Sequence, residues 1–249
     1  MSRRCEEPEI LSAKTRRQAL PVWVVPTIVL AIAAALIVVI FVVNRPSAVE
    51  DEAGAQPEQT QDPDQPDFTE LETRNENDLF AVGPVDAPVG LIVFSDYQCP
   101  YCAQWNEDTL PSMAERAEAG ELRIEWHDAA IFGPASERAA AAVYAAASQG
   151  AFLEYHNALF EGGEHRPESE LTEEALVALA GELGLDTEQF AQDMTSESAL
   201  SAVEQNKQFA QQLGASSTPT FILGGTPMVG AQPTDVFVDA FEQALEQAE

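Results

Sequence analysis

The chain has 249 residues, of which 45% are hydrophobic and 8% aromatic, and this composition excludes a protein that is disordered throughout. The formal net charge is −30, with six basic and three acidic residues in positions 1–45 but six basic and 39 acidic residues in the rest. A surface this acidic repels phosphate backbones, so we expect no nucleic-acid partner. The excess of acid is instead typical of a protein that stays soluble in a salt-rich medium.

Residues 22–43 contain no charged side chain. As a helix that rises about 1.5 Å per residue, this run matches the hydrocarbon core of a bilayer, which is about 30 Å thick. Trp23 stands where an interfacial aromatic belongs, and Pro26 falls near the first turn, where a missing amide costs little. The sequence therefore predicts one N-terminal transmembrane helix.

The charges beside this run predict its orientation. Five basic residues precede it, so the positive-inside rule places residues 1–21 in the cytoplasm as a basic tail. We expect a single-pass protein of the cell membrane whose later residues are extracytoplasmic. A cleaved signal peptide is the alternative, but its apolar region is usually about 7 to 15 residues long, and Val43-Asn44-Arg45-Pro46 is a poor cleavage site.

Residues 46–78 hold four prolines among many Glu, Asp, Gln and Ala residues, with almost no large apolar side chain before Phe68. Such a segment cannot bury enough apolar surface to fold alone. We predict a disordered acidic linker that tethers a folded domain, residues 79–249, to the membrane.

The folded domain alternates strand and helix patterns. A continuous apolar run predicts a strand buried on both faces, an apolar-polar alternation predicts a second strand, and a Gly-Gly turn predicts a hairpin. Start and stop signals at Thr172, Gly184, Asp186 and Gly214 divide an Ala- and Glu-rich block into several helices. In chain order, the predicted elements are a strand at Val89–Phe94, a helix at Ala103–Ala117 kinked at Pro111, a strand at Leu122–His127, an inserted helical domain at about residues 135–213, strands at Thr220–Leu223 and Pro227–Val229, and a closing helix at Thr234–Gln247.

Only two cysteines follow the predicted membrane span, in the loop Cys99-Pro100-Tyr101-Cys102 between the first strand and its helix. A structural disulfide between them would close too small a loop to add much stability. A structural zinc site needs four ligands, and the three histidines show no ligand spacing. We therefore expect no metal and no cofactor, and interpret the motif as a redox pair.

A redox pair also suits the position of the motif. The dipole and free amides of a helix N-terminus stabilise a thiolate, which predicts that Cys99 is the exposed nucleophile. Cys102, one helical turn further on, is then the buried thiol that resolves a mixed disulfide. An extracytoplasmic location agrees, because the cytosol suppresses persistent disulfides.

Pro219, in Ser217-Thr218-Pro219-Thr220, stands directly before a predicted strand. A proline there cannot donate a hydrogen bond to the sheet and often marks a cis peptide. A trans proline that starts the strand is the alternative.

These segments together resemble the DsbA-type thioredoxin-fold family. The resemblance is carried by Phe94–Cys102, His156–Phe160, Thr218–Phe221 and Val229–Gln232, and it spans about residues 79–248. It implies an α/β fold, with a thioredoxin core interrupted by a helical domain, and disulfide exchange with exported cysteine-containing polypeptides.

The resemblance also implies roles for individual residues. Cys99 and Cys102 are catalytic, in that Cys99 attacks and Cys102 resolves. Pro100, Tyr101, Thr218 and Pro219 are implied to bind substrate, with a cis Thr218-Pro219 bond lining the groove where the substrate backbone docks.

Two positions depart from the family pattern. Family members often carry an acid six residues before the first cysteine, thought to move protons for the buried thiol, and Val93 stands there in this chain. Proton relay must then use water or another group. The best-known oxidase of the family has His before the second cysteine, whereas Tyr101 is a neutral phenol that offers a thiolate no positive charge.

We expect an enzyme that forms or shuffles disulfides and is reoxidised by a membrane protein of the quinone-linked kind. Two alternatives stay open. One is an anchored reductase that serves a particular maturation pathway, and the other is a redox-inert adaptor that only binds exported peptides. The presence of both cysteines argues against the adaptor.

Overall fold

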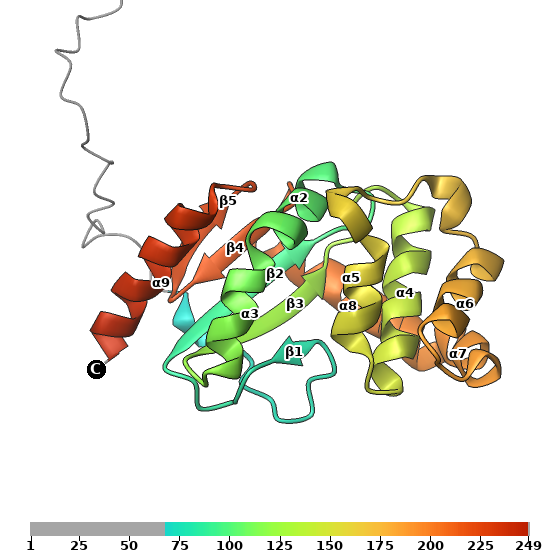
Figure 1. The fold of residues 1–249 in the computed structure, drawn as a ribbon, viewed down its shortest axis with the longest axis horizontal. Coiled ribbons are helices and arrows are strands. Elements are labelled where there is room, and N and C mark those ends of the chain that lie inside the picture. The colour runs from blue at the N-terminus through green and yellow to red at the C-terminus, as the bar shows by residue number, and fades with distance from the viewer. Residues whose placement is uncertain (1–67, 249) are drawn as a thin grey trace, which may run out of the picture. The chain divides into compact units, whose positions relative to one another are not determined.

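The structure, a computed structural model, describes residues 68–248, which form a sheet covered by helices (Figure 1). The predicted tail, the predicted transmembrane helix at residues 22–43 and most of the predicted linker lie outside the described residues. Within residues 68–248, no helix has both the length and the hydropathy that a membrane crossing requires.

The strands form one sheet in the order β1-β3-β2-β4-β5, in which β2 and β3 run parallel and the other neighbours run antiparallel. The strands are β1 (Ala81–Val82), β2 (Val89–Ser95), β3 (Leu122–Asp128), β4 (Thr220–Leu223) and β5 (Thr226–Val229). The α-helices are α2 (Pro100–Asp108), α3 (Leu110–Glu118), α4 (Pro134–Ser148), α5 (Phe152–Leu159), α6 (Glu173–Glu182), α7 (Thr187–Met194), α8 (Glu197–Gln212) and α9 (Thr234–Ala248). Short 3-10 turns are η1 (Thr69–Leu71), η2 (Glu161–Gly163) and η3 (Glu168–Glu170).

Strand β2 lies at the centre of the sheet and is buried along its whole length, as its continuous apolar run predicts. Leu91 and Val93 face the main core, to which α2, α3 and α9 contribute. Ile92 and Phe94 face the opposite side, where they pack with residues near the end of α8. The successive side chains of one strand therefore enter two different clusters.

The helix predicted at 103–117 is two helices, α2 and α3. They meet at Thr109 (φ −117°, ψ −38°), and Pro111 is the second residue of α3, where its missing amide costs little. The helix also starts earlier than predicted, at Pro100. The chain therefore turns helical directly after Cys99.

Helices α4 to α8 occupy the stretch at about residues 135–213 for which the sequence predicts an inserted helical domain. Helix α4 contacts each of the other four, and Figure 1 shows α4 to α7 gathered at one end of the domain, with α9 at the opposite end. Thr172 and Asp186 cap α6 and α7 through their side chains, as their start signals predict. Gly184 and Gly214 follow α6 and α8 with φ of 80° and 71°, a conformation that favours glycine.

Strand β3 is buried along its whole length, including its polar residues. Its apolar-polar alternation is typical of a strand with one face in water. Here both faces are covered, and β3 lies between β2 and the short strand β1, which the sequence analysis did not predict. Two residues are too few to show a period, so β1 carries no local signal.

The predicted start of the folded domain at residue 79 is wrong, because residues 68–78 belong to the folded unit. We call these residues the N-terminal strap. The amide of Phe68 donates to the carbonyl of Gly225 at 3.0 Å, and the Phe68 ring packs against the face of the sheet that carries Ile92.

The rest of the N-terminal strap is held by buried charges of β3. The Glu125 carboxylate accepts hydrogen bonds from the amides of Thr73 and Arg74 at 2.8 and 2.9 Å. Arg123 donates to the carbonyl of Asn75 at 2.6 Å. These partners lie about fifty residues away in the chain, so no local pattern in the strap predicts that it folds.

Candidate active site

The two cysteines lie where β2 gives way to α2, as predicted. Cys99 caps the N-terminus of α2, and Pro100 is the first residue of the helix. The carbonyl of Cys99 accepts the amides of Cys102 and Ala103 at 3.1 and 3.2 Å, which closes the first turn. Both sulfurs therefore lie at the positive end of a helix.

Cys99 is less accessible than predicted. It is 2% exposed, as is Cys102, so the expectation of an exposed nucleophile is wrong for this structure. The Sγ of Cys99 donates a hydrogen bond to the carbonyl of Thr218 at 3.2 Å. Tyr101, between the cysteines, is 61% exposed and points its ring to solvent.

The two thiols differ in acidity. The pKa of Cys99 is lowered to about 6, most of all by the interaction with the Cys102 side chain, and burial opposes this effect. The Thr218 side chain and the amides of Cys102 and Tyr101 act in the same direction as Cys102. Burial raises the pKa of Cys102 well above its ordinary value, and the adjacent Cys99 raises it further. The pair thus contains one ready thiolate and one thiol that holds its proton.

The loop before β4 brings a distant segment to the cysteines. Antiparallel pairing of β4 with β2 sets Thr220 opposite Phe94, so the preceding residues lie near the end of β2. The bond between Thr218 and Pro219 is cis, as the resemblance implied. The Thr218 hydroxyl is buried and makes no hydrogen bond within the described residues, although it lies close enough to Cys99 to lower the pKa of that thiol.

The loop between β2 and α2 also buries a carboxylate, Asp96, which the sequence analysis did not single out. Its Oδ1 accepts the amide of Gln98 at 2.8 Å and the hydroxyl of Ser136 at 2.6 Å, and its Oδ2 accepts the amide of Phe132 at 3.2 Å. Asp96 therefore joins the loop to α4 and to the segment that precedes α4.

A second buried polar group was also missed. The Tyr97 hydroxyl lies 2.9 Å from Nδ1 of His156 on α5, and it is close enough to the side chain of Asp128 for each group to shift the pKa of the other. Burial, and then the charge of Asp96, raise the pKa of Asp128 to about 8, although Tyr97 lowers it. Burial lowers the pKa of His156 to about 3. His156 begins a segment that carries the family resemblance, but its helical pattern does not show that it lies beside Tyr97. Asp128 is the last residue of a strand and gives no local signal.

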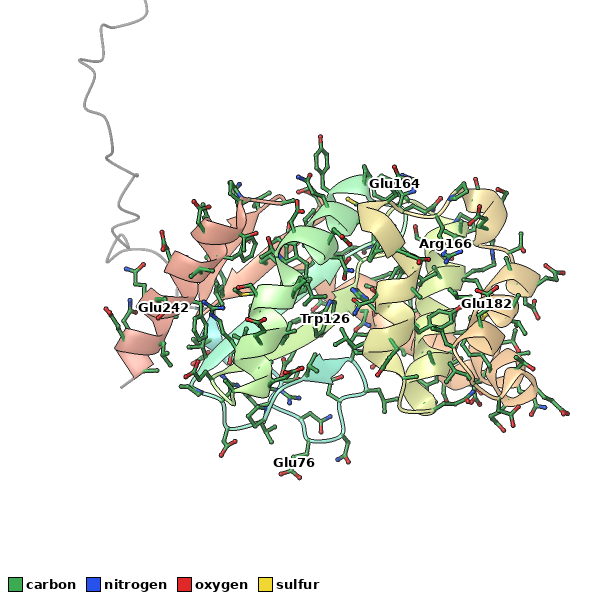
Figure 2. The ribbon with its side chains drawn as sticks, in the orientation of Figure 1. Glu76, Trp126, Glu164, Arg166, Glu182 and Glu242 are labelled. Carbon is green, nitrogen blue, oxygen red and sulfur yellow. The ribbon has the colours of Figure 1, made fainter. Side chains whose placement is uncertain are left out.

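Val93 occupies the position where family members often carry an acid. Its side chain is 1% exposed, and it pairs with Trp126 on β3. Figure 2 shows Trp126 in the interior, between the sheet and α5. Within residues 68–248, no three His, Cys, Asp or Glu side chains lie close enough together to hold a metal ion.

A family model described as thioredoxin matches residues 74–243. The chain belongs to the thioredoxin family. Among its relatives, the probable disulfide bond formation protein D of Bacillus anthracis is 28% identical over 160 residues, which cover 60% of this chain and 74% of that protein. The Na(+)/H(+) antiporter NhaA 3 of Salinispora tropica is 31% identical over 146 residues, 57% of this chain. The chain covers only 21% of that antiporter.

Solved structures agree with the family. The oxidised form of BdbD from Bacillus subtilis superposes with a TM-score of 0.61 at 25% identity, covering 67% of this chain and 92% of that one. The alpha-DsbA1 protein of Wolbachia pipientis gives a TM-score of 0.63 at 18% identity, covering 73% and 97%, a likeness of fold alone. With these relatives, the chain is a thiol-disulfide oxidoreductase of the DsbA type.

Proposed function

We propose that this chain forms or shuffles disulfides in exported, cysteine-containing polypeptides through Cys99 and Cys102. The observation that carries the proposal is the unequal acidity of the two thiols, with the pKa of Cys99 lowered to about 6 and that of Cys102 raised. At neutral pH Cys99 is largely a thiolate, which is the attacking species and the better leaving group. Cys102 then resolves the mixed disulfide.

The acidity of Cys99 also supports the direction of the reaction. A stabilised thiolate favours the reduced protein and makes its disulfide more oxidising. Tyr101 adds no positive charge, and acidic side chains such as Glu76, Glu182 and Glu242 extend from the surface (Figure 2). Salt screens such exposed charges beyond about 8 to 10 Å, so the local effect at the helix N-terminus dominates. We expect a reduction potential between roughly −120 and −270 mV.

We propose that substrate binds across the cysteine loop and the loop before β4. Pro100 and Tyr101 are exposed beside the cysteines. The carbonyl of Thr218 lies 3.2 Å from the Cys99 sulfur, so a chain bonded to that sulfur must pass the segment Thr218-Pro219.

We also propose that residues 22–43 anchor the chain in the cell membrane with the thioredoxin-fold domain on the extracytoplasmic side. The apolar run and the basic residues before it support this orientation. A membrane protein of the quinone-linked kind would then reoxidise the cysteine pair. Labelling of Cys99 in intact cells by a membrane-impermeant thiol reagent tests the topology, and protection of Cys99 until the cells are broken would contradict it.

Cysteine variants test the chemistry. Cys99→Ser should abolish turnover of a reduced, unfolded substrate protein, whereas Cys102→Ser should accumulate mixed disulfides that appear as adducts on a non-reducing gel. Failure of the Cys102 variant to form adducts would overturn the assignment of nucleophile and resolver.

Equilibration with glutathione buffers tests the direction. A potential in the expected interval supports disulfide formation or shuffling. A potential as low as the roughly −270 mV of thioredoxin would favour the alternative of an anchored reductase.

A further inference from the structure

Disulfide exchange at Cys99 requires a proton to arrive at or leave Cys102, and the surroundings of Cys102 exclude solvent. Cys102 is 2% exposed, and burial raises its pKa. Because a thiolate of high pKa is a poor leaving group, opening of the disulfide is slow unless a proton reaches this sulfur. A buried acid near Cys102 would supply it.

Asp128 is a buried carboxyl on the correct face of the sheet. It is the last residue of β3, is 4% exposed, and pairs in register with Ser95, the last residue of β2. Residues paired in this way on neighbouring strands direct their side chains to the same face. The Ser95 side chain lies close enough to Cys102 to lower the pKa of that thiol against the effect of burial. Asp128 and Cys102 are therefore both neighbours of Ser95, which carries a hydroxyl.

Asp128 is also the group in this cluster that can change its protonation near neutral pH. Burial raises the pKa of Tyr97 well above its ordinary value, so the phenol stays neutral. Burial lowers the pKa of His156 to about 3, so the imidazole stays neutral as well and can act as donor or acceptor toward Tyr97. Burial and the charge of Asp96 raise the pKa of Asp128 to about 8.

Hydrogen bonding also differs between the two buried carboxyls, Asp96 and Asp128. Asp96 accepts three hydrogen bonds, whereas Oδ1 of Asp128 has no partner within the described part of the chain. A buried carboxylate with an unpaired oxygen is costly, so the site favours the neutral acid at Asp128. The titratable groups that act on Asp128 are Asp96 and Tyr97 from the loop after β2. Tyr97 in turn contacts His156 on α5 and is affected by Cys102 on α2.

We propose that Asp128 holds the proton that Cys102 gains when the disulfide opens and loses when the disulfide closes. The proposal rests on the proposed function of Cys99 and Cys102 in disulfide exchange. Asp128 acts through the hydroxyls of Tyr97 and Ser95, so it is a positioning residue for the proton and does not touch the substrate.

The disulfide is donated through a mixed disulfide with the substrate. A substrate thiolate attacks Sγ of Cys99, a substrate–Cys99 disulfide forms, and the Cys99–Cys102 bond breaks with its electron pair going to Cys102. The proton of Asp128 passes through the adjoining hydroxyls to Cys102, which leaves a thiol there and a carboxylate at Asp128. When the disulfide forms again, Cys102 returns its proton to that carboxylate before its sulfur attacks.

The test measures how fast the oxidised full chain is reduced by excess dithiothreitol at different pH values, followed by tryptophan fluorescence and corrected for the thiolate fraction of the reductant. The wild-type rate should fall as the pH rises through about 8. Asp128→Asn should be at least about tenfold slower below that pH and should lack the inflection. Tyr97→Phe should weaken the same inflection, whereas Asp239→Asn, an exposed acid on α9, should change neither rate nor profile.

An Asp128→Asn variant with the wild-type rate and inflection would overturn the proposal while leaving the proposed function intact. If the wild-type chain forms no Cys99–Cys102 disulfide with glutathione, and Cys102→Ser traps no adduct, the proposed function fails and this inference fails with it. Should Asp128→Asn fail to fold, the side-chain carboxyl carbon of Asp128 is followed by NMR in the wild-type chain. Titration near pH 8 supports the proposal, and a carboxyl that is ionised throughout the neutral range overturns it.

Discussion

Strand β3 buries polar side chains near both of its ends, and the two ends differ in how well those side chains are paired. Near its start, Arg123 and Glu125 form an ion pair at 2.8 Å, and Glu125 also accepts two amides of the N-terminal strap. At its end, Asp128 lies beside a second acid and has one oxygen without a partner in the described residues. Buried charges whose hydrogen bonds are all satisfied hold neighbouring segments together. A buried acid that lacks a hydrogen-bond partner lowers the free energy of unfolding and is typical of a reactive site.

The largest effect should come from breaking the buried ion pair between Arg123 and Glu125. Glu125→Gln leaves the Arg123 charge buried without its counterion, so we expect a loss of about 3–5 kcal/mol in the free energy of unfolding, measured with urea. The pKa of Cys99 should stay near 6, because the change lies away from the cysteines.

Glu170→Gln is the matched control, since Glu170 pairs with Arg166 at 3.3 Å on the surface, where such a pair contributes less than about 1 kcal/mol. Equal losses in the two variants would contradict the structural role of the buried pair. A double change, Arg123→Met with Glu125→Leu, should recover part of the loss, because it leaves no charge unpaired.

Asp128, at the end of β3, should make the free energy of unfolding depend on pH. The folded-state pKa of Asp128 is about 8, above that of an unfolded Asp, so between roughly pH 4 and 8 the folded state holds a proton that the unfolded state has lost. This contribution is fully present below the unfolded pKa, and it is lost at about 1.4 kcal/mol per pH unit as the pH rises.

Asp128→Asn removes this titration, so the difference between wild type and variant in the free energy of unfolding should slope with pH across that window. Urea unfolding at several pH values measures the slope. A difference that does not vary with pH would mean that Asp128 is ionised in the folded protein.

A smaller effect should locate the edge of the domain. Phe68 is half-buried, so Phe68→Ala should cost about 1–2 kcal/mol, less than the roughly 3–5 kcal/mol of a fully buried Phe. Leu79→Ala, at the start that the sequence predicted, is the control and should cost less, because Leu79 is 42% exposed. If urea unfolding midpoints show that Leu79→Ala costs more stability than Phe68→Ala, the folded domain starts at residue 79.

The smallest effect should be at Thr218. Thr218→Val removes the hydroxyl that helps to lower the pKa of Cys99, and we expect that pKa to rise by about half a unit to one unit with stability almost unchanged. The ultraviolet absorbance of the thiolate follows the titration. Thr220→Val is the control, because the Thr220 hydroxyl donates to the carbonyl of Ser217 at 2.7 Å, and a similar shift there would remove Thr218 from the site.

Much of this protein follows from local patterns in its sequence. The continuous apolar run of β2, the turn of the hairpin and the start and stop residues of the insert each act within a few residues of themselves, so their elements are predictable. The redox pair is equally local, because a cysteine directly after a strand and before a helix meets the helix dipole wherever the domain lies.

Contacts between distant segments decided the rest. Folding of the N-terminal strap depends on Glu125, and the buried acid beneath the cysteines depends on Asp128 pairing with Ser95 across two strands. Burial of Cys99 likewise depends on Thr218, which is 119 residues away in the chain. The charge state of a side chain depends on its solvent and its neighbours, and only the tertiary structure decides which neighbours those are.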